Sequence, residues 1–307
     1  MTEPIAIAVD GLSKRFGDVT ALDNFSIAVP KGSIFGVLGT NGAGKTTAFK
    51  CMLGLARADA GTTLFEGSPL TPALFERMTY VHERPALYSD PRVSDHLEWT
   101  RRTYARYDAP RAAKLLDLFG LTPKKRVKTL SKGQQSALAL TLAFVTRPDI
   151  LILDEPASGL DPVNQRNVLD LLIGEAAGGA TIVFSSHAIG QVERAADRVA
   201  ILHRGKKMLD GEVDLLKADE KVVEATFEND APSVNGLARD PSVRRIVRAG
   251  RLLRAFVRGN SDEVARHIAA LEPKSLRVLD QNLEDIFLNA VAASDGETAA
   301  AAADLES

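Results

Sequence analysis

The stretch SIFGVLGTNGAGKTTAFK, residues 33–50, decides the fold. Its opening run, 34–38, has the length and composition of a buried parallel strand. Residues 39–46, GTNGAGKT, match the phosphate-binding loop pattern G-x-x-x-x-G-K-S/T at every fixed position. A helix is expected from Lys45 to about residue 55. Because strand, glycine-rich loop and helix follow one another, the stretch predicts an α/β fold built around a parallel sheet.

The loop also has the chemistry of a triphosphate site. Its glycines allow a turn tight enough for successive N–H groups to point inward. The helix start adds the positive end of its dipole, Lys45 supplies a charge for the terminal phosphates, and the Thr46 hydroxyl suits Mg²⁺. The expected nucleotide contacts in this loop are Gly39, Thr40, Asn41, Gly42, Ala43, Gly44, Lys45, Thr46 and Thr47.

The composition limits the class of partner. The 307 residues carry a net charge of −2, which gives no electrostatic case for nucleic acid, so none is expected as a partner. No signal peptide is evident, and the longest uncharged window, 133–146, is too short to cross a bilayer. We therefore expect a soluble, cytoplasmic chain that reaches a membrane only through a partner. The single Cys51 is expected to be a small buried hydrophobe.

Before and after the loop, short strands are expected. The pattern predicts strands at 5–9 and 25–29, separated by a turn region at 12–22, and further strands at 61–65 and 78–81. Phe16 falls in the turn region and allows two interpretations. Its ring either packs on the sheet or stacks on a nucleobase.

Residues 93–144 show a helical pattern. This segment is basic, and the side chains concerned are Arg101, Arg102, Arg106, Lys124, Lys125, Arg126 and Lys128. A solvated basic face is the simpler interpretation, and contact with anionic lipid or an acidic partner is the alternative.

Two later strands carry candidate catalytic groups. The run ILILDEP, 150–156, places Asp154 and Glu155 at the carboxyl edge of the sheet, where ligands of α/β folds bind. Asp154 suits Mg²⁺ binding through a water, and Glu155 suits a general base for the attacking water. The strand 181–186 ends at His187, which is either structural or a sensor of the terminal phosphate.

The segment TLSKGQQ, 129–135, opens a helix. Ser131 and Gln134 have the spacing of a capping box, which alone would make this segment purely structural.

Taken in chain order, GTNGAGKT, LSKGQ (130–134), ILILDE (150–155), SGLD (158–161) and His187 resemble the ATP-binding subunits of ABC transporters over about residues 5–217. The resemblance implies ATP and Mg²⁺ as cofactors. It also implies a phosphate-loop (RecA-like) α/β ATPase core with an antiparallel β subdomain and a helical subdomain inserted at about 86–146.

The resemblance further implies a head-to-tail homodimer that encloses two ATP molecules. The signature residues of one copy, Ser131, Lys132, Gly133 and Gln134, would contact the γ-phosphate bound by the other copy. Asp161 would communicate across the interface, His187 would contact the γ-phosphate, and Phe16 would stack on the adenine.

The sequence departs from the family pattern at a few positions. Thr40 replaces a Pro, and Lys132 replaces the commoner Gly of the signature. Glu83, preceded by an atypical His82, stands where the family has a Gln that contacts Mg²⁺ and water. The catalytic candidates are therefore Glu155, His187 and Glu83, and the metal-binding candidates are Thr46, Asp154 and Glu83.

The composition changes near residue 219. Residues 1–218 are expected to form the ATPase domain, 219–292 a small α+β extension, and 293–307 a disordered tail. The segment LEDIFL, 283–288, resembles the C-terminal extension of ATPases that serve bacterial drug, antibiotic and polysaccharide exporters.

The sequence thus predicts an ATPase subunit that dimerises on ATP and powers a separate membrane permease, most simply an exporter, at the inner face of the cell membrane. One alternative is a soluble ABC-type ATPase acting on ribosomes or DNA, although the chain has one core and no heptad run. Another is a regulatory ATP-binding module. A small-molecule kinase is not expected, because such an enzyme does not need the LSKGQ segment.

Overall fold

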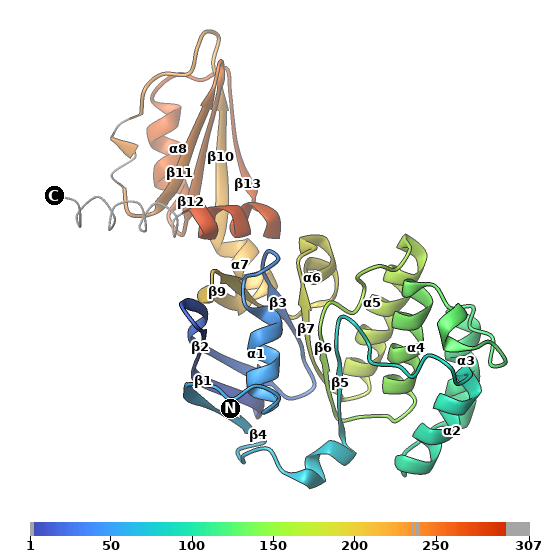
Figure 1. The fold of residues 1–307 in the computed structure, drawn as a ribbon. Coiled ribbons are helices and arrows are strands. Elements are labelled where there is room, and N and C mark those ends of the chain that lie inside the picture. The colour runs from blue at the N-terminus through green and yellow to red at the C-terminus, as the bar shows by residue number, and fades with distance from the viewer. Residues whose placement is uncertain (1–2, 235, 238–239, 293–307) are drawn as a thin grey trace. The chain divides into compact units, whose positions relative to one another are not determined.

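The computed structural model describes residues 3–234, 236–237 and 240–292. The chain forms two compact units, Met1–Asp210 and Gly211–Ser307, which we describe separately (Figure 1). The domain boundary predicted from the sequence lies later, at residue 218, and this boundary of the ATPase domain stays a prediction.

A six-stranded sheet forms the centre of the first unit. Its strand order is β5-β6-β7-β3-β8-β9, and the four pairs among β5, β6, β7, β3 and β8 are parallel. The strands are β3 (Ile34–Leu38), β5 (Met78–Val81), β6 (Ile150–Leu153), β7 (Thr181–Ser186), β8 (Arg198–His203) and β9 (Lys206–Glu212). Every residue of β3, β6 and β7 is buried, which explains the apolar runs at 34–38, 150–153 and 182–184. The helices α1 (Lys45–Met52), α5 (Pro162–Ala177) and α6 (Ile189–Ala195) follow β3, β6 and β7.

An antiparallel sheet of order β2-β1-β4 packs its apolar residues into the core beside α1. Its strands are β1 (Ile5–Phe16), β2 (Val19–Pro30) and β4 (Ala60–Phe65). The turn predicted at 12–22 is wrong, because both strands continue to the Gly17-Asp18 turn. Register shifts accompany the polar part of the β1–β2 pair, where Lys14 pairs with Leu22 and Arg15 with Thr20. Cys51 is buried in the core, as predicted, and burial raises the pKa of its thiol.

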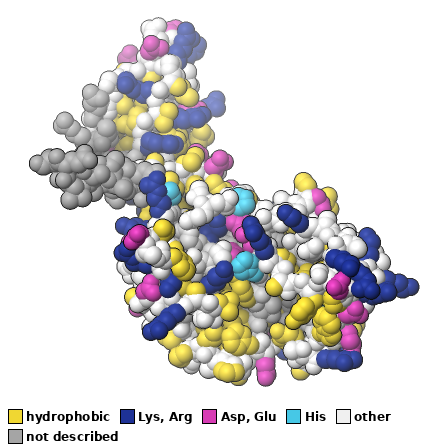
Figure 2. All heavy atoms as spheres, in the orientation of Figure 1, with side chains coloured by type: hydrophobic (Ala, Val, Ile, Leu, Met, Phe, Trp, Pro, Cys, Tyr) yellow, Lys and Arg dark blue, Asp and Glu magenta, His cyan; other side chains and the backbone are white. Residues whose placement is uncertain are grey.

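The helical insertion consists of α2 (Val93–Thr103), α3 (Ala109–Leu118) and α4 (Lys132–Phe144). Two 3₁₀ turns, η1 (Pro72–Glu76) and η2 (Val127–Thr129), lie before and within it. Many of its basic side chains have acidic partners: Arg101 and Arg102 contact Glu98, Arg106 contacts Asp149, and Lys128 contacts Asp90. Figure 2 shows basic and acidic side chains mixed over this region, which favours the solvated-face interpretation.

The C-terminal unit is an antiparallel sheet with helices. The strand order is β11 (Val243–Ala249), β12 (Leu252–Arg258), β10 (Glu220–Thr226), β13 (Ser275–Asp280). The helix α8 (Ser261–Ala269) packs on one sheet face through Val264 and Ile268. The helix α7 (Val213–Asp219) was not predicted, and residues 283–292 are also helical. The predicted disordered tail, 293–307, lies outside the described residues. None of the helices in the described part of the chain is long and apolar enough to cross a membrane.

Candidate active site

The phosphate-binding loop joins β3 to α1 at the carboxyl edge of the parallel sheet. Packing fixes its shape, because a Cβ at Gly39 would lie 2.4 Å from the carbonyl oxygen of Leu202. At Gly44 a Cβ would lie 2.4 Å from the oxygen of Ala21, and φ there is +107°. Around Gly42 there is open space for a Cβ, so the loop is open to a ligand on that side. The glycines thus form a preshaped cradle of backbone N–H groups.

Lys45 is buried at the start of α1. Its Nζ donates hydrogen bonds to the carbonyl oxygens of Gly39 (2.7 Å) and Thr40 (3.2 Å). The same Nζ lies 3.1 Å from Glu155 Oε1. The lysine predicted to bind phosphate is therefore paired with the predicted general base.

Asp154 lies fully buried directly after β6. Its two carboxylate oxygens accept hydrogen bonds from Thr46 Oγ1 and Ser185 Oγ, each at 2.7 Å. Ser185 in turn accepts a hydrogen bond from the Glu155 N–H at 2.9 Å. Sequence reasoning missed Ser185, and its only signal was a polar residue at the end of the apolar run TIVFSS. A hydroxyl and a carboxylate side by side are the oxygen donors that Mg²⁺ prefers, so Thr46 and Asp154 fit this ion.

Glu155 and His187 follow neighbouring strands, β6 and β7, and the structure brings them together. The imidazole Nδ1 of His187 lies 2.8 Å from Glu155 Oε2. Glu155 has a φ of +50°, the left-handed region that few non-glycine residues adopt. The carboxylate is thus held between a lysine and a histidine.

Glu83 is not part of this cluster. Its side chain is exposed, and among the described contacts no hydrogen bond or ion pair joins it to Lys45, Thr46 or Asp154. The neighbouring His82 accepts a hydrogen bond from the Arg84 N–H at 3.0 Å and meets the Tyr80 ring edge-on. Burial, with a contribution from the charge of Asp154, raises the pKa of Tyr80.

The signature segment starts α4, and the predicted capping box is confirmed. Ser131 Oγ accepts the Gln134 N–H, and Gln134 Oε1 accepts the Ser131 N–H, both at 3.2 Å. A Cβ at Gly133 would lie only 2.9 Å from the carbonyl oxygen of Gly159, so the segments 131–134 and 158–161 are in close contact. The remaining signature side chain, Lys132, is exposed.

Asp161 caps α5, a role that the sequence analysis did not assign to it. One oxygen accepts the N–H groups of Val163 and Asn164 at 3.0 Å, and the other accepts the Asn164 side chain. These hydrogen bonds, chiefly from Asn164, lower the pKa of Asp161.

Phe16 ends β1 with 55% of its surface exposed. Lys14 Nζ lies 5.3 Å from the ring centroid. More than half of the residue is open to solvent, and stacking of the ring on a nucleobase stays a prediction.

Comparison with known proteins agrees with this geometry. Residues 22–158 match the family model described as "ABC transporter". The chain is 30% identical over 280 residues to the ABC transporter ATP-binding protein YtrB of Bacillus subtilis, covering 90% of this chain and 95% of that protein. It is 32% identical to the Nod factor export ATP-binding protein I of Ralstonia nicotianae, covering 92% of each.

Among solved structures, one titled "Structure of ATP binding subunit of ABC transporter" aligns with a TM-score of 0.63 and 27% identity, covering 69% of this chain and 92% of that chain. The phosphate-loop α/β ATPase fold predicted from the sequence is therefore confirmed, and the chain belongs to the ATP-binding subunits of ABC transporters, a family of ATPases coupled to transport.

Proposed function

We propose that this chain dimerises on ATP, hydrolyses it with Mg²⁺, and drives a separate membrane permease in the direction of export. The observation that carries the proposal is the meeting of Lys45, Asp154, Glu155 and His187 at one edge of the sheet. These groups come from three neighbouring strand ends and cover phosphate binding, metal binding and base catalysis.

The contacts suggest an order of events. When ATP binds, the Lys45 ammonium leaves Glu155 and contacts the terminal phosphates, because the carboxylate and the phosphates compete for the same positive charge. Glu155, freed on that side and still beside His187, then accepts a proton from the attacking water. Thr46 and Asp154 are the residues that would hold Mg²⁺, and the bound ion would supply positive charge to neutralise the phosphates. Glu83 reaches this site only if its segment moves.

The dimer would place the signature of one copy on the nucleotide of the other. The capping box leaves other N–H groups of the first turn of α4, including those of Lys132 and Gly133, to face a phosphate. Asp161 then acts from a fixed position, because its carboxylate is committed to the α5 cap.

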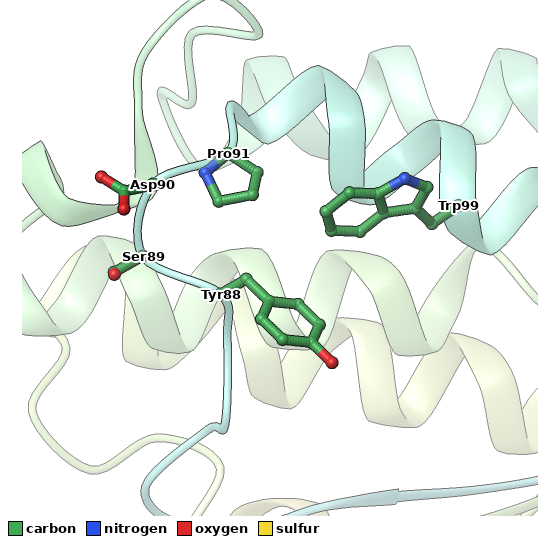
Figure 3. A pocket seen from close by; sticks show the side chains of 5 residues that line it. All are labelled: Tyr88, Ser89, Asp90, Pro91 and Trp99. Carbon is green, nitrogen blue, oxygen red and sulfur yellow. The ribbon is translucent and has the colours of Figure 1, made fainter.

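The permease would dock on two neighbouring hollows beside the insertion. A groove of about 410 Å³ lies between β5 and α4 and has an apolar lining that includes Pro85, Leu87 and Leu142. A second hollow, of about 450 Å³, is lined by residues 88–91 and Trp99 (Figure 3). Tyr88 is 72% exposed and Trp99 44% exposed, and their rings meet edge-on at 5.8 Å. Exposed aromatic pairs of this kind are typical of protein interfaces.

The proposed direction of transport and the proposed location of the chain rest on its similarity to known relatives. The Nod factor protein is named for export, and the match covers 92% of that protein. We therefore place this chain at the cytoplasmic face of a membrane, bound to an export permease, as a homodimer and without a nucleic-acid partner.

The test uses tagged Glu155→Gln with ATP and Mg²⁺, applied to detergent-solubilised membranes. We expect ATP to be retained without turnover and a polytopic membrane protein to be recovered. The matched control is Glu193→Gln, a charge-equivalent change in α6, which should turn ATP over normally. Unimpaired ATP turnover in Glu155→Gln would show that Glu155 is not the general base. Recovery of ribosomes or DNA-repair factors instead of a permease would contradict the proposed role in transport.

A further inference from the structure

The C-terminal unit contains a strongly basic hairpin that the nucleotide chemistry does not use. Residues 243–258, VRRIVRAGRLLRAFVR, hold six arginines and no acid. They form β11, the turn and β12, with β11 at the outer edge of the sheet. We name this segment the arginine hairpin.

Two of its arginines are neutralised by neighbours. Arg254 Nε lies 2.7 Å from Glu224 on the adjacent strand β10. Arg258 Nε lies 3.0 Å from Asp219 at the end of α7. These two side chains have local partners and need no further ligand.

The other four are not neutralised in this way. The Arg245 guanidinium lies 4.3 Å above the Phe256 ring, which holds it in place without cancelling its charge. Arg244, Arg248 and Arg251 are exposed. Within residues 3–234, 236–237 and 240–292, the side chains of these three make no hydrogen bond and no ion pair shorter than 4.0 Å, and the charge of Arg244 acts only weakly on the buried Glu220, whose pKa stays raised. The hairpin therefore presents a local excess of positive charge.

An exposed aliphatic side chain, Val247, lies beside these charges on β11. Val247 is 37% exposed, and it pairs with Arg254 on the sheet face opposite α8. Arg245 lies on this same face, whereas Arg248 pairs with Leu253 and therefore lies on the α8 face, so the edge strand presents arginines on both of its faces. Basic and hydrophobic side chains are interspersed over the visible face of this unit in Figure 2.

This arrangement favours one class of anionic partner. The three phenylalanines of the described unit, Phe227, Phe256 and Phe287, are buried, so there is no exposed aromatic ring on which bases could stack. The free arginines lie along an edge strand and at its turn, where they suit an extended charged surface. Guanidinium groups bind phosphate in two-point fashion, and the exposed Val247 beside them suits the headgroup region of a bilayer.

We propose that the arginine hairpin binds the surface of an anionic phospholipid bilayer. The inference rests on the proposed function in one respect, because that function brings the chain to a membrane. Through the hairpin the ATPase would have its own lipid contact in addition to its permease, and this contact would increase the local concentration of subunit beside its partner.

The experiment is co-sedimentation of the purified full chain with vesicles, without nucleotide or permease. We expect binding to vesicles of equal parts phosphatidylcholine and phosphatidylglycerol, weakening as NaCl is added, and little binding to phosphatidylcholine alone. The double variant Arg244→Gln/Arg248→Gln should bind about 30-fold more weakly, from the usual contribution of a basic side chain near such a surface. The single variant Arg251→Gln, outside the strands, should lose about fivefold.

The matched control is Lys124→Gln/Lys125→Gln, which removes the same charge from exposed positions of the helical insertion. It should bind within about twofold of the unaltered protein. Greater loss in this control than in the hairpin variants would move the lipid contact to the insertion and overturn the proposal, as would equal binding to both kinds of vesicle. Because the assay contains neither ATP nor permease, its failure would leave the proposed transport function untouched.

Discussion

The contact between Gly133 and Gly159 gives a sharp test of how the signature segment is held. A Cβ at position 133 would lie 2.9 Å from the Gly159 carbonyl oxygen, whereas ordinary contact begins at 3.4 Å. In Gly133→Ala the two segments must therefore separate by about 0.5 Å. Such overpacking costs about 1–3 kcal/mol, and alanine recovers at most about 1 kcal/mol through its higher helix propensity. We expect the free energy of unfolding to fall by about 0–3 kcal/mol.

The matched control is Gly174→Ala in α5. At that position a Cβ meets nothing within 4 Å, so only the helix propensity changes. The free energy of unfolding should rise by up to about 1 kcal/mol. The two substitutions are chemically identical, and their difference of about 1–3 kcal/mol, measured by urea unfolding, isolates the contact with Gly159.

Turnover should separate the two variants further. A 1 Å displacement of a catalytic group can cost a hundredfold, so a shift of about half that size predicts roughly tenfold slower hydrolysis in Gly133→Ala. ATP binding to the phosphate loop should stay unchanged. If Gly133→Ala is stabilised as much as Gly174→Ala and hydrolyses ATP at the normal rate, the contact between position 133 and Gly159 does not constrain the signature segment. Slow turnover with no difference in stability would place the effect at the partner copy instead of at Gly159.

Three further predictions follow from individual contacts. Asp161→Ala should lower the melting temperature by about 2–4 °C through loss of the α5 cap, while Asp161→Asn, which can still cap, should not; equal losses in thermal scans would contradict the capping role. Lys45→Met should lower the free energy of unfolding by about 1.5–3 kcal/mol, because it leaves His187 as the remaining partner of the buried Glu155 carboxylate. In a double-mutant cycle with Glu155→Gln, the coupling energy between the two positions should be about 1–3 kcal/mol. Strictly additive effects of the two substitutions would show that the Lys45–Glu155 pair is not formed in solution. Burial raises the pKa of Glu220, so the folded state favours the protonated form of this carboxyl. Its contribution to the free energy of unfolding is therefore complete below the ordinary glutamate pKa, and it is lost as pH rises through the pKa of the folded state. Glu220→Gln should therefore stabilise the protein at pH 7 but not below about pH 4.5, and chemical unfolding at both pH values checks this.

The sequence predicted the strands of the parallel sheet because their signal is local. Residues 78–81 and 181–186 were predicted with the bounds that the structure shows, since each has a short, mostly apolar run between polar segments. The capping box at Ser131 has an equally local signal. In contrast, β1 and β2 looked like a loop at 12–22, because their polar residues form a ladder only when β4 and the core are in place. The short helix α7 gave too few turns for a periodic pattern.

The site residues could be found from the sequence, but not their pairings. Lys45, Asp154 and Glu155 each stand in a recognisable motif, yet nothing in the motifs shows that Lys45 lies against Glu155. The hydrogen bond from Ser185 to Asp154 depends on β7 lying beside β6, although α5 separates them in the chain. Sheet order follows from how the helices cover the two faces, which the spacing of motifs does not contain.

The precision of the site follows from that sheet order. The apolar residues of β3, β6 and β7 are buried on both faces, so these strand ends have little freedom to move. Ser185 accepts the Glu155 N–H and donates to Asp154, and it thereby ties β7 to both acids that follow β6. The same bond helps to hold Glu155 at its positive φ, a conformation that costs about 1 kcal/mol or more and persists only where the surroundings fix it. A single serine, invisible as a motif, thus fixes the metal-binding candidate and the candidate base relative to each other.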